Sequence, residues 1–552
     1  ELVPIGNGAM PGRTFIEWDK DDIDALGILK VDCLALGMLT CLSKCFALIR
    51  QGDGATKRRS DEGSPSLDTI PSEDPAVYDM LCRADSVGVF QVESRAQMSM
   101  LPRLRPRCFY DLVIEVAIVR PGPIQGGMVH PYLRRRNGEE PITYPSPAVQ
   151  QVLHKTLGVP LFQEQVMRLA VVAAGFTPGE ADQLRRAMAA WRRPGVLDRF
   201  RARLIGGMLA RGLSRRFAEQ TFEQILGFGE YGFPESHAAS FALLVYASAW
   251  LKHYYPAAYA AALLNSQPMG FYAPAQIVRD AQEHGVEARG IDVNHSGYDC
   301  TLESGSGARV PDSETRRLSP ALRLGFRLIH GISREAVCGI EAARRDGPYR
   351  SVADLARRAR VGRGTLTRLA AADAFRSIGL DRRRALWDVL ALRDEPPLLR
   401  GLEPEDEPVP LPGMTLGEHV FADYDATGLS LTAHPIALVR GELNGLRAST
   451  AADIRKGTQG RPVRAAGLVL VRQRPGTAGG ITFATLEDET GVVNLIIRPN
   501  VYERFREAAH GIAWIAEGRI ERVGEVVHVQ ASRIEDLGER LARLRVISRD
   551  VR

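Results

Sequence analysis

The sequence changes its hydrophobic pattern once along the chain, and this change limits the fold more than any other feature. Most of the first 390 residues favour helices, whereas residues from Val463 to about Leu537 form short runs typical of β-strands. Gly479-Gly480 and Gly524 fall where hairpin turns would join these runs. The pattern predicts a multidomain α+β protein that is mainly helical and ends in a five-stranded OB-type β-barrel.

An OB barrel is a module that binds single-stranded nucleic acid through basic and aromatic side chains. The predicted strands here contain few aromatic residues. We therefore expect weak, sequence-tolerant binding to a single strand. A barrel that contacts another protein remains the alternative.

Composition excludes some classes of protein. No stretch approaches 18 uncharged apolar residues, so a membrane span is not expected. The seven cysteines are scattered and odd in number, which argues against a disulfide framework and for a reducing compartment. The net charge is only +5, so the total charge does not indicate nucleic-acid binding, and the distribution of the basic residues is more informative. Of the 71 basic residues, only seven are lysines.

The apolar run at residues 26–32 ends in a lone carboxylate, Asp32, with Lys30 two residues before it. If this segment is extended, Lys30 and Asp32 share one face. Such a pair could serve a triphosphate bound to Mg²⁺, with the carboxylate on the metal and the lysine on phosphate oxygens. An ion pair at the end of a surface strand is the alternative. Residues 34–50 predict an apolar helix after this run.

A basic helix is predicted after Thr177. Thr177 is expected to be its N-cap, Pro178 its first residue and Glu180 the partner in a capping box. Residues 180–216 contain ten arginines, among them Arg185 and Arg186, against three acidic residues. A patch of this density attracts a polyanion.

Two loops carry further candidates for phosphate binding. Arg120 opens a rigid Arg-Pro-Gly-Pro turn, which could equally be structural with a solvated arginine. In residues 229–237, Ser236 is expected to cap the following helix, and His237 would stand beside it at the helix N-terminus. Local structure is the alternative for both. The three successive arginines at 134–136 predict a solvated surface.

Residues 322–345 suggest a helix-hairpin-helix around Gly331, which would offer backbone N–H groups to a DNA phosphate. Ser333 stands where a second glycine would allow close approach of the phosphate. Residues 344–384 hold twelve arginines against four acidic residues, which favours contact with a duplex backbone, although a solvated helical face would look the same. The DNA-binding candidates are Gly331, Arg344, Arg345, Arg363 and Arg368.

Several motifs together resemble the bacterial C-family DNA polymerases, the family of the DNA polymerase III alpha subunit. The matching segments are 18–22, 26–39, 87–94, 120–123, 184–188, 229–237 and 428–435. The resemblance implies that Asp32 is a catalytic carboxylate and ligand of Mg²⁺. It also implies that the incoming nucleotide is bound by Lys30, Arg120, Arg185, Arg186, Ser236 and His237.

Three segments resemble the error-prone branch of this family rather than the replicative branch: 94–98, 189–193 and 546–552. The resemblance implies an enzyme that adds deoxynucleotides to a primer 3′ end by a two-metal mechanism during damage-tolerant synthesis. Its implied partners are primer-template DNA, deoxynucleoside triphosphates, and also a sliding clamp and mutasome proteins. The implied location is the cytoplasm, with no membrane contact.

The resemblance also divides the chain into expected domains. These are the C-terminal part of a palm at 1–60, fingers at 61–290, a helix-hairpin-helix region at 291–390, a linker and connecting segment at 391–460, an OB-fold at 461–540 and a tail at 541–552.

Two other readings stay open. The family's first two catalytic carboxylates lie in an upstream motif that this sequence lacks, and the chain starts at Glu1, so we expect the C-terminal part of a longer polymerase. On its own it could be a catalytically incomplete fragment that binds DNA and nucleotide. A replicative alpha subunit is a further possibility, and the 94–98 segment argues against it.

Overall fold

The computed structural model describes residues 3–7, 14–18, 20–28, 35–53, 65–120, 123, 127–189, 198–227, 234–270, 272–305, 320–392, 410–474, 478–523, 526–541 and 549–551. Lys30 and Asp32 lie outside these residues, as do Gly524 and most of the predicted linker. The prediction for residues 26–32 therefore stays a prediction.

The N-terminal part consists of two short antiparallel strands and five helices. Their bounds are β1 (Ile5–Asn7), β2 (Thr14–Ile16), α1 (Lys20–Ala25), α2 (Leu36–Asp53), α3 (Pro75–Cys82), α4 (Arg95–Leu104) and α5 (Phe109–Ile118). The apolar helix expected at 34–50 is confirmed as α2. Asp74 accepts a hydrogen bond from the amide of Ala76 at 2.9 Å, and Pro75 follows it, so α3 begins where a capped helix should.

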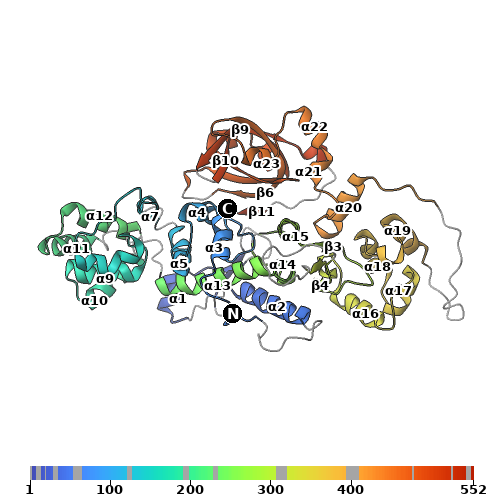
Figure 1. The fold of residues 1–552 in the computed structure, drawn as a ribbon, viewed down its shortest axis with the longest axis horizontal. Helices are drawn as coiled ribbons and strands as arrows, with labels where there is room; N and C mark the ends of the chain where they lie inside the picture. The colour runs from blue at the N-terminus through green and yellow to red at the C-terminus, as the bar shows by residue number, and fades with distance from the viewer. Residues whose placement is uncertain are drawn as a thin grey trace.

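A second group of helices forms a lobe at one end of the long axis (Figure 1). It contains α7 (Val129–Arg136), α8 (Pro147–Leu153), the 3₁₀ turn η1 (His154–Thr156), α9 (Gln163–Ala174), α10 (Pro178–Ala189), α11 (Asp198–Ala210) and α12 (Arg215–Gly227). The capping box predicted for α10 is confirmed. The amide of Thr177 donates to Glu180 at 2.7 Å, and the amide of Glu180 donates to the Thr177 hydroxyl at 3.2 Å.

The centre of the helical part is built on α13 (Glu235–Tyr254), α14 (Pro256–Asn265) and α15 (Pro274–Glu283). Helix α13 packs against α5, and α14 packs against α2. Both α13 and α14 are apolar on nearly every side, which is the pattern of a helix buried in a core. The two helices predicted for 257–290 are confirmed as α14 and α15.

The opposite end of the molecule holds a small sheet and four helices (Figure 1). The elements are β3 (Ala288–Arg289), β4 (Thr301–Glu303), β5 (Ala321–Arg323), η2 (Phe326–Leu328), α16 (Arg334–Arg344), α17 (Val352–Ala359), α18 (Arg363–Ala371), η3 (Arg376–Ile378) and α19 (Arg382–Ala391). Strand β5 lies between β3, which is parallel to it, and β4, which is antiparallel. The first arm of the predicted hairpin is the single 3₁₀ turn η2, and the second arm is α16.

Four helices lead into a C-terminal barrel. The helices are α20 (Leu416–Thr427), α21 (Pro435–Leu438), α22 (Arg440–Gly445) and α23 (Ala451–Arg455). The barrel and its additions are β6 (Pro462–Gln473), β7 (Thr482–Asp488), β8 (Gly491–Ile497), α24 (Pro499–Arg504), η6 (Ala508–His510), β9 (Ala513–Val523), β10 (Val526–Asp536), η7 (Gly538–Leu541) and β11 (Arg549–Val551). The strand order β6-β7-β8-β10-β9 closes because β9 also pairs with β6. The predicted multidomain α+β fold with a five-stranded barrel is confirmed.

Strand β6 belongs to two sides of the barrel. Residues 462–468 of β6 pair with β9, and residues 468–473 pair with β7. Gly467 stands at this change of partner, where a Cβ atom would lie 2.6 Å from the carbonyl oxygen of Glu487. Glycine is required here because the two backbones approach too closely for any side chain.

The barrel packs on the helical part through strands β7 and β8. Arg95, at the start of α4, donates one hydrogen bond to the carbonyl of Ala484 at 3.1 Å and another to that of Leu495 at 2.9 Å. Its guanidinium also lies 5.0 Å from the ring centroid of Phe483. Burial lowers the pKa of Arg95 to about 9. Further along β7, Glu487 forms a salt bridge with Arg279 of α15 at 3.0 Å.

None of the helices in the described part of the chain combines the length and apolar character needed to cross a membrane.

Replacing Arg95 with alanine should loosen the barrel from the helical part. The change removes two charged hydrogen bonds and the contact with Phe483, together worth about 2 kcal/mol or more. We expect amides of α4 and of β7–β8 to exchange hydrogen faster in the Arg95→Ala chain. The exposed Arg107→Ala change serves as the control and should leave exchange in these segments unchanged. Equal exchange in both variants would contradict the role given to Arg95.

Candidate nucleic-acid interface

The predicted nucleotide-binding residues of the helical lobe make local contacts. Arg185 on α10 forms a salt bridge with Asp182, one turn earlier, at 2.9 Å, and is partly exposed. The side chain of Arg186 lies outside the described residues. Because a surface salt bridge of this kind is weak, the Arg185 guanidinium could be recruited by a phosphate at little cost.

Arg120 and His237 are partly buried. The Arg120 Nε donates to the carbonyl of Val116 at 3.1 Å, and burial lowers the pKa of its guanidinium. The His237 ring lies 4.2 Å from that of Phe241, one turn further along α13. These contacts do not join Arg120, Arg185 and His237 to one another.

The prediction that Ser236 caps α13 is wrong. Helix α13 begins at Glu235, its N-cap is Pro234, and Ser236 is already the second helical residue. The amide of Glu235 instead donates to the carboxylate of Glu164 on α9 at 3.0 Å. A carboxylate from a neighbouring helix thus takes the place of a local hydroxyl at the positive end of α13.

The predicted surface at residues 134–136 is only partly solvated. Arg136 donates to both oxygens of the buried carboxylate of Asp111, at 2.7 Å each, and also to the carbonyl of Leu104. This arginine therefore joins α7 to α5, whereas Arg134 remains half exposed beside Glu140.

The hairpin between η2 and α16 brings two predicted DNA-binding residues together. Gly331 adopts a φ of +72°, which favours glycine. A Cβ atom there would lie only 3.2 Å from Nε of Arg368 on α18. Both residues are exposed, so a positive charge stands directly beside the turn. The Ser333 hydroxyl accepts the amide of Ala336 at 3.1 Å, so this residue is the N-cap of α16.

The hairpin is held from behind by α20. The amide of His330 donates to the carbonyl of Ala426 at 2.8 Å, and Ile329 is buried in the core. The exposed face of the hairpin therefore has a fixed backbone, which suits recognition of a phosphate without rearrangement.

The other arginines of this region differ in how they are engaged. Arg344 donates to the carbonyls of Val293 at 3.0 Å and Ser296 at 2.8 Å, which ties α16 to the preceding segment. Arg363 is exposed and donates to the carbonyl of Leu392. Arg345 is exposed at the end of α16. The structure thus places Arg345, Arg363 and Arg368 at the surface and uses Arg344 internally.

The sequence predictions did not include a charge network in the helical part, which is centred on the buried Lys252 and has three partly buried partners. The ammonium of Lys252 on α13, which is almost fully buried, lies 2.8 Å from both Asp85 and Asp280. His284 lies 2.7 Å from the other oxygen of Asp85. These residues are up to 199 positions apart, so no local pattern could have revealed them.

The network explains the titration of its members. Burial by itself would raise the pKa of Asp85, but the hydrogen bond from His284 and the charge of Lys252 lower that pKa overall. Burial raises the pKa of Asp280 despite Lys252. The hydrogen bond to Asp85 raises the pKa of His284.

This network does not fit a metal ion. Asp85, Asp280 and His284 form the one group within the described ranges whose ligand atoms cluster closely enough for a cation. The Lys252 ammonium already sits against both carboxylates. A divalent cation there would meet a positive charge at hydrogen-bonding distance from its own ligands.

Two family models match this chain, one over helices of the N-terminal part and the helical lobe and the other over the region of the hairpin. The model for the bacterial DNA polymerase III alpha subunit finger domain matches residues 38–212, and the model for a helix-hairpin-helix motif matches residues 285–385. The chain is thus similar to the finger domain of the bacterial DNA polymerase III alpha subunit over one stretch and to a helix-hairpin-helix motif over another.

Three similar proteins are named error-prone DNA polymerase. The error-prone DNA polymerase of Rhodopirellula baltica is 55% identical over 100% of this chain and 47% of its own length. Those of Anaeromyxobacter dehalogenans strain 2CP-1 and Alkalilimnicola ehrlichii are both 56% identical, over 97% and 100% of this chain and 47% and 52% of their own lengths. This chain therefore spans about half the length of the curated relatives it matches.

Among the solved structures that match is that of asparaginyl-tRNA synthetase from Pyrococcus horikoshii. It is 24% identical and covers 18% of this chain and 24% of its own, with a TM-score of 0.15. A score this low carries no argument.

The pair of His284 and Asp85 predicts a pH-dependent contribution to stability. Because the folded pKa of His284 is raised, this contribution is complete below the unfolded value of about 6.5 and is lost as the pH rises through the folded pKa. Replacing His284 with glutamine should therefore lower the melting temperature more at pH 6 than at pH 8.5. The exposed His510→Gln change should lower it by the same small amount at both pH values. A loss for His284→Gln that does not vary with pH would refute the assignment.

Proposed function

We propose that this chain forms part of a DNA polymerase of the error-prone alpha-subunit type, which adds deoxynucleotides to a primer 3′ end. The observation that supports this most is identity of about 55% along the whole chain to proteins named error-prone DNA polymerase. An identity this high over 552 residues, together with the finger-domain match, favours the same chemistry in the complete protein.

In this proposal the hairpin and its arginines bind the duplex part of primer-template DNA. The N–H groups of the turn near Gly331 donate hydrogen bonds to a phosphate, and Arg368 neutralises its charge. Arg345 and Arg363 add charge on the same region of the chain. Arg344 acts indirectly, because its bonds to Val293 and Ser296 hold α16 in place.

A second set of residues, two of them on α10 of the helical lobe and the others outside it, binds the incoming deoxynucleoside triphosphate. The residues proposed to meet the phosphates are Lys30, Arg120, Arg185, Arg186, Ser236 and His237. Arg185 suits this role because it is partly exposed and only weakly engaged by Asp182. The roles of Lys30, Arg186, Ser236 and His237 rest on the resemblance of their motifs to the family.

The proposed metal is Mg²⁺, held by Asp32 together with carboxylates of the complete protein. The network around the buried Lys252 is excluded from this role by its own ammonium group. When bound, the metal would activate the 3′-hydroxyl and stabilise the leaving pyrophosphate. A protein of this kind would work in the cytoplasm during damage-tolerant synthesis, with a sliding clamp and mutasome proteins as partners.

The domain boundaries predicted from the sequence are kept as part of this proposal. A catalytically incomplete fragment is a second candidate for residues 1–552 alone, because one carboxylate cannot hold two metal ions. The relatives' greater length favours this view of the isolated chain.

Arg368→Gln should weaken binding to duplex DNA. The variant loses one phosphate contact, so the slope of log affinity against log salt should shrink by about 0.9. Fluorescence anisotropy with a 20-base-pair duplex over a range of NaCl concentrations measures this slope. Arg376→Gln is the matched control, since Arg376 is exposed in the same region but paired with Asp373. An equal slope in wild type and Arg368→Gln would refute the hairpin contact.

Primer extension tests the chemistry. We expect residues 1–552 alone to bind primer-template without extending it, because one carboxylate, Asp32, cannot hold two metal ions. The complete protein should extend the primer in Mg²⁺, and Asp32→Ala should abolish extension while leaving DNA binding intact. Extension by the complete Asp32→Ala protein would contradict the assigned site. Extension by residues 1–552 alone would contradict the incomplete-fragment reading.

A further inference from the structure

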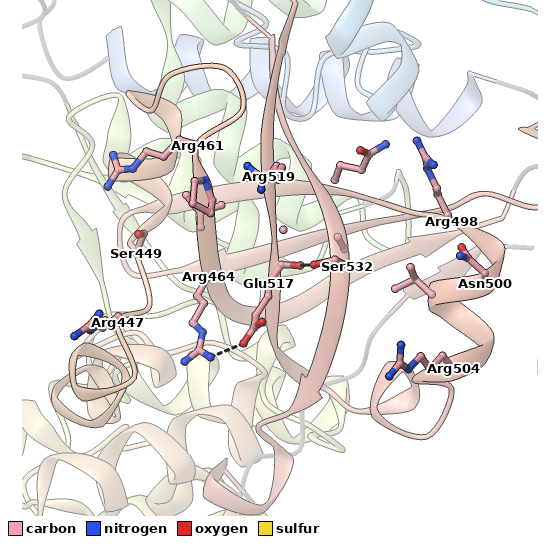
Figure 2. A pocket seen from close by; sticks show the side chains of 16 residues that line it. Arg447, Ser449, Arg461, Arg464, Arg498, Asn500, Arg504, Glu517, Arg519 and Ser532 are labelled. Atoms are coloured by element: carbon pink, nitrogen blue, oxygen red, sulfur yellow. Dashed lines mark hydrogen bonds and ion pairs between the residues drawn. The ribbon is translucent and has the colours of Figure 1, made fainter.

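A second arginine-rich surface lies on the barrel, away from the strands that face the helical part. A groove of about 940 Å³ is lined by residues of three barrel strands, of α24 and of the segment before α23. Six of its lining residues are arginines: Arg447, Arg461, Arg464, Arg498, Arg504 and Arg519. In Figure 2, Arg447 and Arg461 stand on one side of the strands, Arg498 and Arg504 on the other, and Arg464 and Arg519 between them.

The charge of the groove is poorly compensated. Glu517 is the one acidic residue in the lining, and it pairs with Arg464 at 2.5 Å. Arg519 donates to the carbonyl of Gly460 at 3.0 Å, which leaves its charge unpaired by that bond. Within the described ranges no salt bridge to a carboxylate is found for Arg461 or Arg498, and both are exposed. Six arginines that line one groove with a single carboxylate among them favour an anion.

The position of the groove follows from the barrel topology. Its strands are the first half of β6, with β9 and β10. Residues 517 and 519 of β9 point outward because Trp514, Ala516 and Ile520 fill the core. OB folds commonly bind ligands on the face of their second and third strands. Here those strands are β7 and β8, and Arg95 and Arg279 pack the helical part against them.

The chemistry of the lining points to a sugar-phosphate backbone. Besides the arginines, the groove presents the polar side chains of Ser449, Asn500, Gln530 and Ser532, and its lining contains no aromatic residue. Stacking of bases on aromatic side chains is therefore not available, whereas phosphate oxygens match the guanidinium groups. A flexible single strand can bend to follow a groove on one barrel, whereas bending a stiff duplex costs free energy.

We infer that this groove binds the phosphate backbone of a single strand, without reading its bases, on the side of the barrel opposite the usual OB face. The inference rests on the proposed function in that nucleic acid is the ligand of the chain. It adds a second contact, separate from the hairpin that binds the duplex.

The test compares two charge-matched double variants of the whole chain. Arg461→Gln/Arg498→Gln removes one arginine from each side of the groove. Arg506→Gln/Arg533→Gln removes two exposed arginines elsewhere on the barrel. Anisotropy with fluorescein-labelled dT20, and separately with a 20-base-pair duplex, is measured from low to high NaCl.

We expect the groove variant to bind dT20 roughly tenfold more weakly at 0.1 M salt, with a salt slope smaller by about 1.4, because each single-strand phosphate contact contributes about 0.7. The control variant should keep the wild-type slope, and duplex binding should be unchanged in both. Arg461→Lys/Arg498→Lys should retain the wild-type slope, since it keeps the charge. That variant also guards against a folding defect.

The outcomes separate this inference from the proposed function. Equal losses in the groove and control variants would mean that only net charge matters and would overturn the inference. A loss that is as large for the duplex as for dT20 would overturn the single-strand assignment. If the wild-type chain bound neither DNA, the proposed function would fail as well. Normal binding of both DNAs, with no effect of the groove variant, would overturn the groove alone.

Discussion

The contact between Arg95 and the barrel determines how the surfaces of this molecule are presented. A guanidinium from α4 donates to the carbonyls of Ala484 and Leu495, so β7 and β8 turn toward the helical part. The first half of β6, β9 and β10 are left on the other side, where the groove arginines gather. The barrel is attached through backbone carbonyls that accept hydrogen bonds from the Arg95 guanidinium. The position of its basic groove is a consequence of that attachment.

The arginines of this chain have two different roles, and their contacts and exposure show which role each one has. Arg136 donates hydrogen bonds to Asp111, and Arg344 donates to backbone carbonyls. These bonds join helices to their neighbours. Arg368, Arg461 and Arg498 stand exposed beside a glycine turn or a groove. Only the second kind can release counterions when a nucleic acid binds. The number of arginines in the sequence is therefore larger than the number whose charge is available to DNA.

Local patterns predicted local features well. The Thr177–Glu180 capping box, the apolar helix at α2 and the barrel strands follow from short-range chemistry, and all are confirmed. The predicted Ser236 cap was wrong because Glu164, 71 residues before Glu235, accepts the hydrogen bond from the Glu235 amide. The Lys252 network and the barrel groove join residues far apart in sequence, so only folding reveals them. Lys30 and Asp32 remain predictions, because they lie outside the part of the chain that the structure describes.

Duplex and single strand are proposed to bind on separate arginine surfaces of this chain. Hydrogen-exchange mass spectrometry of residues 1–552 with dT20, and separately with a duplex, tests this proposal most directly. We expect the duplex to protect amides around Gly331 and the start of α16, whereas dT20 should protect α24 and the strands of the groove. Protection of β7 and β8 by dT20, or one common footprint for both DNAs, would contradict it.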